Sequence, residues 1–205
     1  HQMNMIDSLF SNLLSALENA LLYEKMEQTV ENRTFELKNK TLMLEKAVLT
    51  IDDKNKKITS SINYAQRIQE VLFSSSSALR AAFRDAMLMY QPKHIVSGDF
   101  VFFKQINGKS IIVVADCTGH GVPGAFMSMM AFNLLYESVV TQKCDSPSMI
   151  LEYLDEQIRI RLKQDQSKIR DGLDASILVI DNTSNTCVFS GAKNHYKKEE
   201  YCNTL

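Results

Sequence analysis

Apolar residues recur at every seventh position through the first third of the chain. The column contains Ala16, Tyr23, Val30, Leu37, Leu44, Ile51, Ile58, Ala65 and Leu72. A seven-residue period held for about eight heptads predicts a supercoiled helix rather than an ordinary amphipathic one. The column three residues further on is mostly polar, as at Arg33, Lys40 and Lys54, which predicts a weak coil or one that converts between registers. Two arrangements stay open: a parallel dimeric coiled coil, and a single solvated helix that folds back on the following domain.

The strongest helix breakers are confined to the second part of the chain. All seven glycines lie at or after Gly98, and all three prolines at or after Pro92. Four serines at 74–77 follow the helical region and interrupt it. We therefore expect a long helix or coiled-coil linker at 1–73 and a separate folded domain at 74–205. Residues 78–90 are compatible with either a helix or an extended segment.

Beyond residue 98 the pattern becomes that of hairpins and short helices. Apolar runs at 100–106 and 109–115 flank Asn107-Gly108, a strong hairpin signal. A second pair of runs, 175–180 and 187–190, predicts another hairpin. Between the hairpins, 125–140 predicts a deeply buried helix, and Ser146-Pro147 predicts the start of a second helix. Two hairpins flanking two helices predict a layered α+β domain.

Composition and cysteine usage narrow the functional classes. The net charge of −1 argues against a nucleic-acid groove, and no apolar segment approaches the length that spans a bilayer. The N-terminus has no secretory signal pattern and suggests a fragment of a longer protein. Four cysteines without a CxxC pair argue against a zinc site or disulfide framework and suit a reducing, cytoplasmic location.

Three aspartates occupy the ends of predicted strands. Asp116 follows the apolar run 111–115 and opens a loop with glycines at 119, 121 and 124; Asp99 precedes the first run, and Asp174 precedes the third. Oxygen ligands grouped in this way suit a pair of hard divalent cations, which can promote phosphoryl hydrolysis. The glycines would let backbone approach metal or phosphate closely.

Each of these residues also has a simpler structural interpretation. An isolated aspartate after a strand is usually a turn former or a helix cap, and a lone His120 is more often structural. The glycine-rich loop is neither a dinucleotide fingerprint nor a P-loop, which argues against nucleotide binding.

Several ordered motifs resemble the SpoIIE-like branch of the metal-dependent (type-2C, PPM) Ser/Thr protein phosphatases. The matching stretches are 62–70, 90–100, 115–129, 171–174 and 189–192, so the resemblance covers about residues 58–194. It implies a helix-flanked β-sandwich in αββα layers and hydrolysis of phosphoserine or phosphothreonine with Mn²⁺ or Mg²⁺. It also implies that Asp116 bridges two metals, that Asp99 and Asp174 are further metal-site acids, and that the backbone carbonyl of Cys117 is a ligand.

The resemblance carries further expectations about the whole protein. Residues 17–23 resemble the last helix of a GAF sensor domain that runs into a coiled linker, which implies an upstream sensor. The homodimer joined through the coil is expected from the heptad column. The family pattern continues beyond Gly191-Ala192 to further strands and a last metal-binding aspartate, which this sequence lacks, and the charged residues 197–205 read as a solvated end. The alternative is therefore a truncated, catalytically silent domain that signals by dimerisation.

Overall fold

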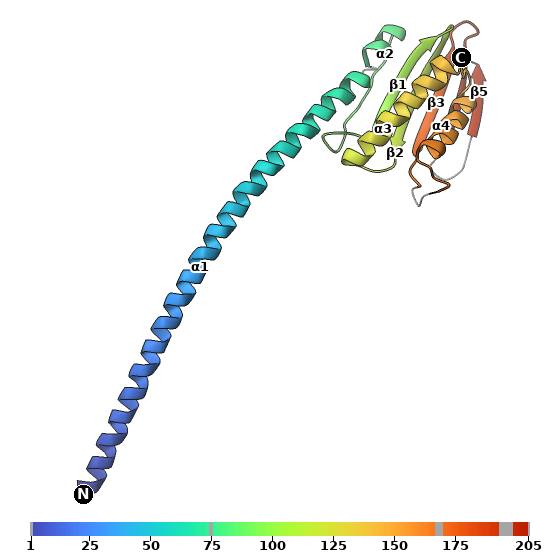
Figure 1. Cartoon of the computed structure of the whole chain (residues 1–205). Coiled ribbons are helices and arrows are strands. Elements are labelled where there is room, and N and C mark those ends of the chain that lie inside the picture. Colours follow the sequence, from blue (N-terminus) through green and yellow to red (C-terminus); the bar gives the residue numbers. More distant parts are fainter. Residues whose placement is uncertain (1, 74–75, 167–169, 193–198, 205) are drawn as a thin grey trace. The chain divides into compact units, whose positions relative to one another are not determined.

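The computed structural model describes residues 2–73, 76–166, 170–192 and 199–204. Contacts divide the chain into two compact units, His1–Ile58 and Thr59–Leu205. The elements, labelled in Figure 1, are α1 (Gln2–Leu72), α2 (Ser76–Ala82), β1 (Asp99–Ile106), β2 (Lys109–Cys117), α3 (Gly121–Tyr136), the π-helical turn η1 (Glu137–Thr141), α4 (Pro147–Arg161), β3 (Leu173–Asp181), β4 (Thr186–Ala192) and β5 (Glu199–Thr204).

The first unit is one stretch of α1. Every side chain from 9 to 58 is exposed, including the heptad column of Leu37, Leu44 and Ile51. Ion pairs one turn apart, such as Glu36 with Lys40 at 2.7 Å, support the helix by a few tenths of a kcal/mol each. The predicted long helix is thus confirmed. None of the described helices has the length and apolarity needed to cross a membrane.

The second unit is built on a single antiparallel sheet in the order β1-β2-β3-β4-β5. Both predicted hairpins are confirmed, β1 with β2 and β3 with β4. Asn107 and Gly108 take φ values of 50° and 76°, the left-handed geometry that a tight hairpin between twisted strands requires. The α+β class follows from this sheet and its helices.

Helices α3 and α4 cover one face of the sheet (Figure 1), α3 over β1 and β2, and α4 over β3 and β4. Alternate strand residues point toward them, and the core contains Phe102, Val113 and Ile177, which are almost completely buried. The Ser146 side chain accepts a hydrogen bond from the Met149 backbone N–H at 3.4 Å, so the predicted start of α4 is confirmed.

An aromatic cluster joins the C-terminal end of α1 to this core. Phe73 stacks on Phe100 and packs at a tilt against Phe132, with centroid distances of 5.3 and 5.1 Å, and Phe102 packs edge-on against Phe132 at 5.3 Å. Aromatic pairs at these separations contribute beyond their buried area. The last turns of α1 are therefore part of the folded domain.

Two segments differ from the expectations drawn from sequence. The serine run does not end all helical structure, because α2 begins within it at Ser76; Leu79, buried by packing, gives this short helix an anchor. The charged tail is not a free end either. Glu199–Thr204 pairs with β4 as strand β5, because an open strand edge leaves backbone groups that a following segment can satisfy.

The sheet face opposite α3 and α4 carries a second row of side chains. Val114 is 54% exposed there, and Ile112 and Leu178 are only partly buried. A second sheet, as in a full β-sandwich, is not present among the residues that the structure describes. The five-stranded sheet and its two helices thus account for one sheet layer and one helical layer of the expected architecture.

We predict that Phe102→Ala destabilises the domain by about 3–5 kcal/mol, because it removes a buried ring from the aromatic cluster. Val114→Ala, on the opposite face of the same sheet, should cost below about 1 kcal/mol. Urea denaturation of both variants checks this difference. Equal losses would contradict the assignment of the core to the helix-covered face.

Candidate metal centre

Three aspartates lie side by side at one end of three neighbouring strands. In the β1–β2 register Asp99 is opposite Asp116, and in the β2–β3 register Asp116 is opposite Asp174. Directly opposed residues have Cβ atoms about 4.5–5.5 Å apart and project from the same face. The structure therefore brings together the three acids that the sequence singled out, with Asp116 in the middle.

Strand alternation directs these acids away from the hydrophobic core. Phe100, Ala115 and Ala175, the neighbours of the three aspartates, are buried beneath the helices, so the acids project from the opposite face. There they line a cavity of about 800 Å³, whose other walls include Tyr90 and Pro92. The three acids therefore face a molecule that enters this cavity.

Electrostatics within the row favour a bound cation. Partial burial and the neighbouring Asp116 carboxylate raise the pKa of Asp99 above its ordinary value, burial being the larger cause. A cation that neutralises the neighbouring carboxylate stabilises the charged form of such a group. The neighbouring carboxylates repel each other when both are charged, and a bound divalent cation would relieve that repulsion.

The loop after β2 is shaped by close contacts between main-chain atoms. A Cβ atom added at Gly124 would lie 2.5 Å from the Gly119 carbonyl oxygen, and one added at Gly98 would lie 3.0 Å from the same atom. Gly119 itself has a φ of 95°, which disfavours any side chain. These glycines allow the loop to fold tightly over the start of β1.

Cys117 can contribute its backbone but not its thiol. The side chain is 3% exposed, and burial, with the nearby Asp116 and Asp99, raises the pKa of the thiol to about 12. The Cys117 N–H donates to the Gly98 carbonyl at 3.3 Å. A buried neutral thiol is a poor metal ligand, so only the carbonyl of Cys117 remains available for the role implied by the family resemblance.

Hydrogen bonds fix this loop to the start of β3. The Thr118 N–H donates to the Gly172 carbonyl at 2.9 Å, and the Gly172 N–H donates to the Thr118 hydroxyl at 3.0 Å. This reciprocal pair holds the segment that carries Asp116 close to the segment that carries Asp174.

A buried polar cluster, which the sequence pattern did not reveal, supports the approach to Asp99. Gln69 of α1 accepts from the Ser97 N–H at 3.0 Å and donates to the Ser97 carbonyl at 2.9 Å and to the Ser128 hydroxyl at 3.0 Å. The Asp99 N–H in turn donates to the Ser97 hydroxyl at 3.0 Å. The available signal was the spacing of Ile62, Gln69 and Phe73, one face of α1 that is turned inward.

Two further contacts near the row had no clear sequence signal. The Tyr90 hydroxyl donates to the Asp99 carbonyl at 2.9 Å. His120, which the sequence suggested was structural, stacks on His94 with ring centroids 5.1 Å apart. The stack joins the loop after β2 to the segment before β1.

The arrangement is a row rather than a closed cage. Within the described ranges, no group of three or more His, Cys, Asp or Glu side chains converges on a single point. The outer strands of a three-strand row are about 10 Å apart, so Asp99 and Asp174 cannot share one ion. Asp116 lies between the other two acids, opposite one of them in each strand pair.

Part of the chain is similar to known proteins. Residues 107–196 match the family model of stage II sporulation protein E (SpoIIE). The chain is also similar to the SiaA-PP2C domain of Pseudomonas aeruginosa, with a TM-score of 0.60 and 28% identity over 71% of this chain. Part of the chain is therefore similar in sequence to SpoIIE and similar in fold to a PP2C-type domain.

The similarity is partial in extent. The chain spans 60% of the SiaA-PP2C chain. A structure of the PP2C phosphatase domain and part of the regulatory domain of SpoIIE from Bacillus subtilis is more distant, with a TM-score of 0.42, 16% identity, and coverage of 54% of this chain and 37% of that one. No curated protein matches the sequence. The resemblance of residues 17–23 to a GAF helix stays a prediction.

We predict that Mn²⁺ raises the melting temperature of the SpoIIE-like domain. An ion at about 100 times its Kd stabilises by about 2.7 kcal/mol, which corresponds to several degrees. Asp116→Asn should abolish the shift, because it removes the central carboxylate. Asp155→Asn, an exposed position on α4, is the matched control and should keep the shift. A shift that survives in Asp116→Asn would exclude the acid row as the metal site.

Proposed function

We propose that the chain is part of a metal-dependent protein phosphatase that hydrolyses phosphoserine or phosphothreonine. The observation that carries the proposal is the row Asp99–Asp116–Asp174 across three adjacent strands. The SpoIIE family match and the likeness to the SiaA-PP2C domain support the same activity. In this proposal residues 1–73 form the linker, whose last turns pack on the phosphatase portion at 74–205.

Each residue of the row has a distinct part in this proposal. Asp99, Asp116, Asp174 and the Cys117 carbonyl would together hold two divalent ions, Mn²⁺ or Mg²⁺, with Asp116 shared between them. Bound cations supply Lewis acidity and an activated water for attack on phosphorus. Gly119 and Gly98 let the loop pack closely against the chain beside the acids. A phosphate group can then approach without meeting a side chain.

The cavity in front of the row suits a phosphorylated protein side chain. Its walls combine the acids with the exposed Tyr90 and Met89 of the segment before β1. An open cavity of about 800 Å³ admits an extended side chain of a protein substrate. The substrate would be a phosphoprotein in a bacterial-type signalling pathway in the cytoplasm.

Regulation through α1 is the second part of the proposal. Gln69 and Phe73 hold the end of α1 against Ser97 and the aromatic cluster, two residues from Asp99. The heptad column continues beside them on another part of the helix surface, where Ala65 and Leu72 are exposed. A homodimeric coil driven by an upstream sensor would therefore act on the helix that supports the acid row.

A catalytically silent dimerisation module is the alternative function. The chain covers 60% of the SiaA-PP2C chain, and the acids among the described residues form a row rather than a converging metal-binding group. This alternative gains support if the domain binds Mn²⁺ and self-associates but shows no turnover.

We predict Mn²⁺-stimulated release of phosphate from a phosphoserine peptide. Asp116→Asn should lower the rate by at least about 100-fold, because changes even to groups that only support a metal ligand cost about 10–100-fold. Asp155→Asn is again the control. Malachite-green detection of phosphate measures the rates of the parent chain and of both variants. Turnover unaffected by Asp116→Asn would exclude the proposed centre.

We predict that the chain is a dimer at micromolar concentration, held by the heptad column. Leu37→Lys combined with Leu44→Lys should shift it to monomer, because lysine at a packed seam buries unpaired charge. The control combines Phe35→Lys with Met43→Lys, which are similarly exposed but lie outside the column. Sedimentation equilibrium measures the mass; a monomeric parent, or an equal loss in the control, contradicts the seam.

A further inference from the structure

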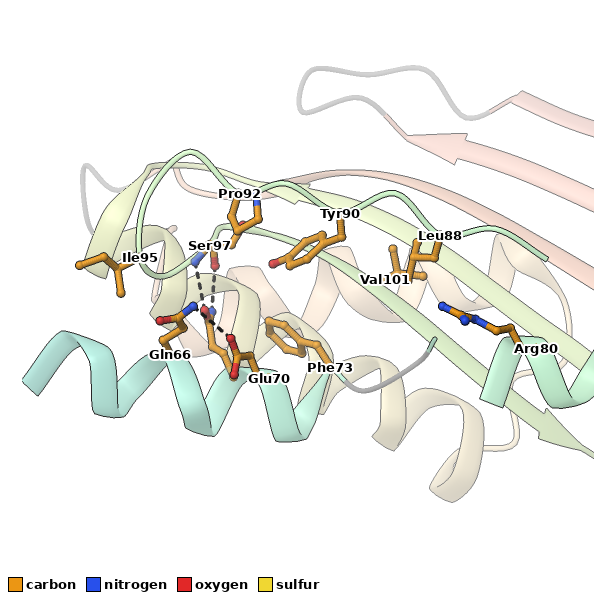
Figure 2. Close-up of a pocket in the computed structure, with 11 residues that line it drawn as sticks. Gln66, Glu70, Phe73, Arg80, Leu88, Tyr90, Pro92, Ile95, Ser97 and Val101 are labelled. Carbon is orange, nitrogen blue, oxygen red and sulfur yellow. Dashed lines mark hydrogen bonds between the residues drawn. The ribbon is translucent and has the colours of Figure 1, made fainter. Parts of the chain in front are cut away.

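A second cavity, of about 390 Å³, lies within the domain between the end of α1, α2 and the segment before β1. Figure 2 shows its lining side chains. The apolar walls come from three parts of the chain and consist of Phe73, Leu88, Tyr90, Pro92, Ile95 and Val101. A concave, mostly apolar site of this volume with a few polar groups is typical of small-molecule binding.

The polar groups of this cavity differ in whether they already have partners. Gln69 and Ser97 satisfy each other, and Gln66 donates to Glu70 at 3.0 Å. Arg80 of α2 forms no hydrogen bond or ion pair with any residue in the described part of the chain, and its side chain extends toward Leu88 and Val101 in Figure 2. The cavity therefore presents one unpaired guanidinium beside an apolar surface.

The distribution of charge indicates the chemistry of an occupant. Glu70 and Arg80 lie on opposite sides of Phe73 (Figure 2). A guanidinium binds a carboxylate through two parallel hydrogen bonds. The Phe73 ring and its apolar neighbours suit a hydrocarbon or aromatic body, and the Glu70 carboxylate suits a hydrogen-bond donor at the far end.

We propose that this cavity binds a small organic carboxylate with an aromatic or aliphatic body and a hydrogen-bond donor opposite the carboxylate. Arg80 pairs with the carboxylate, Phe73 and Leu88 pack on the body, and Glu70 accepts from the donor. The site is separate from the acid row, and the inference does not depend on the proposed phosphatase activity.

A ligand in this cavity would be connected to the acid row through residues that hydrogen-bond to Asp99. The cavity wall includes Ser97, whose hydroxyl accepts from the Asp99 N–H, and Tyr90, whose hydroxyl donates to the Asp99 carbonyl. The opposite wall is the end of α1. An occupant thus contacts both the supporting helix and the residues that position Asp99.

The test uses 3-(4-hydroxyphenyl)propionate as the probe and its neutral amide as the matched compound, titrated into the full chain without metal and followed by ligand-observed NMR. A compound of about twelve heavy atoms is expected to bind in roughly the millimolar range or tighter. We expect the carboxylate to bind at least about tenfold more tightly than the amide, since a charge-assisted pair is lost in the amide.

Variants locate the binding site. Arg80→Gln should weaken carboxylate binding by at least about tenfold, whereas Arg84→Gln, an exposed position outside the cavity, should leave it unchanged. Leu88→Trp should block binding by filling the cavity, with an unaltered urea midpoint showing that the domain is folded. Absence of binding at about 10 mM, equal binding of the amide, or equal losses in Arg80→Gln and Arg84→Gln would each overturn the proposal. None of these results bears on phosphate release.

Discussion

The cross-strand register of β1, β2 and β3 is the constraint on which the candidate centre depends. Burial of Phe102, Val113 and Ile177 against α3 and α4 sets that register, because one face of each strand must meet the helices. A slip of one residue would turn the buried set toward solvent and the aspartates toward the core. The hydrophobic layer therefore fixes the position of the acids, although no apolar side chain of that layer need contact a metal or a substrate.

A small polar cluster inside the protein fixes the orientation of the end of α1. Gln69 is 4% exposed and its amide makes both donor and acceptor contacts with one backbone unit, that of Ser97. A buried amide left without partners would cost about 1–3 kcal/mol. The helix can therefore sit against the domain in only a narrow range of rotations about its axis. The aromatic stacking of Phe73 restrains the same end of the helix along its length.

Local signals in the sequence were sufficient for much of the fold. Asn107-Gly108 predicted the first hairpin, Ser146-Pro147 predicted the start of α4, and the placement of Asp99, Asp116 and Asp174 at strand ends predicted their grouping. Contacts between segments distant in sequence could not be read in this way. Gln69 is 28 residues from Ser97 and 59 from Ser128, and although its spacing from Ile62 and Phe73 marks an inward face, it does not identify these partners. The pairing of β5 depends likewise on an open edge of β4, which is a property of the assembled sheet.

The contact between Gly124 and Gly119 has a consequence for how the loop can change over generations. The atoms that meet are main-chain atoms on both sides, so no rotamer change can make room for even a methyl group. A single substitution at Gly124 would have to displace the carbonyl of Gly119 and, through Gly98, the strand that bears Asp99. A variant with a side chain at this position could therefore survive only if several backbone segments shifted together, which one mutation cannot supply. The loop after Asp116 therefore cannot change at Gly124 through a series of single tolerated substitutions.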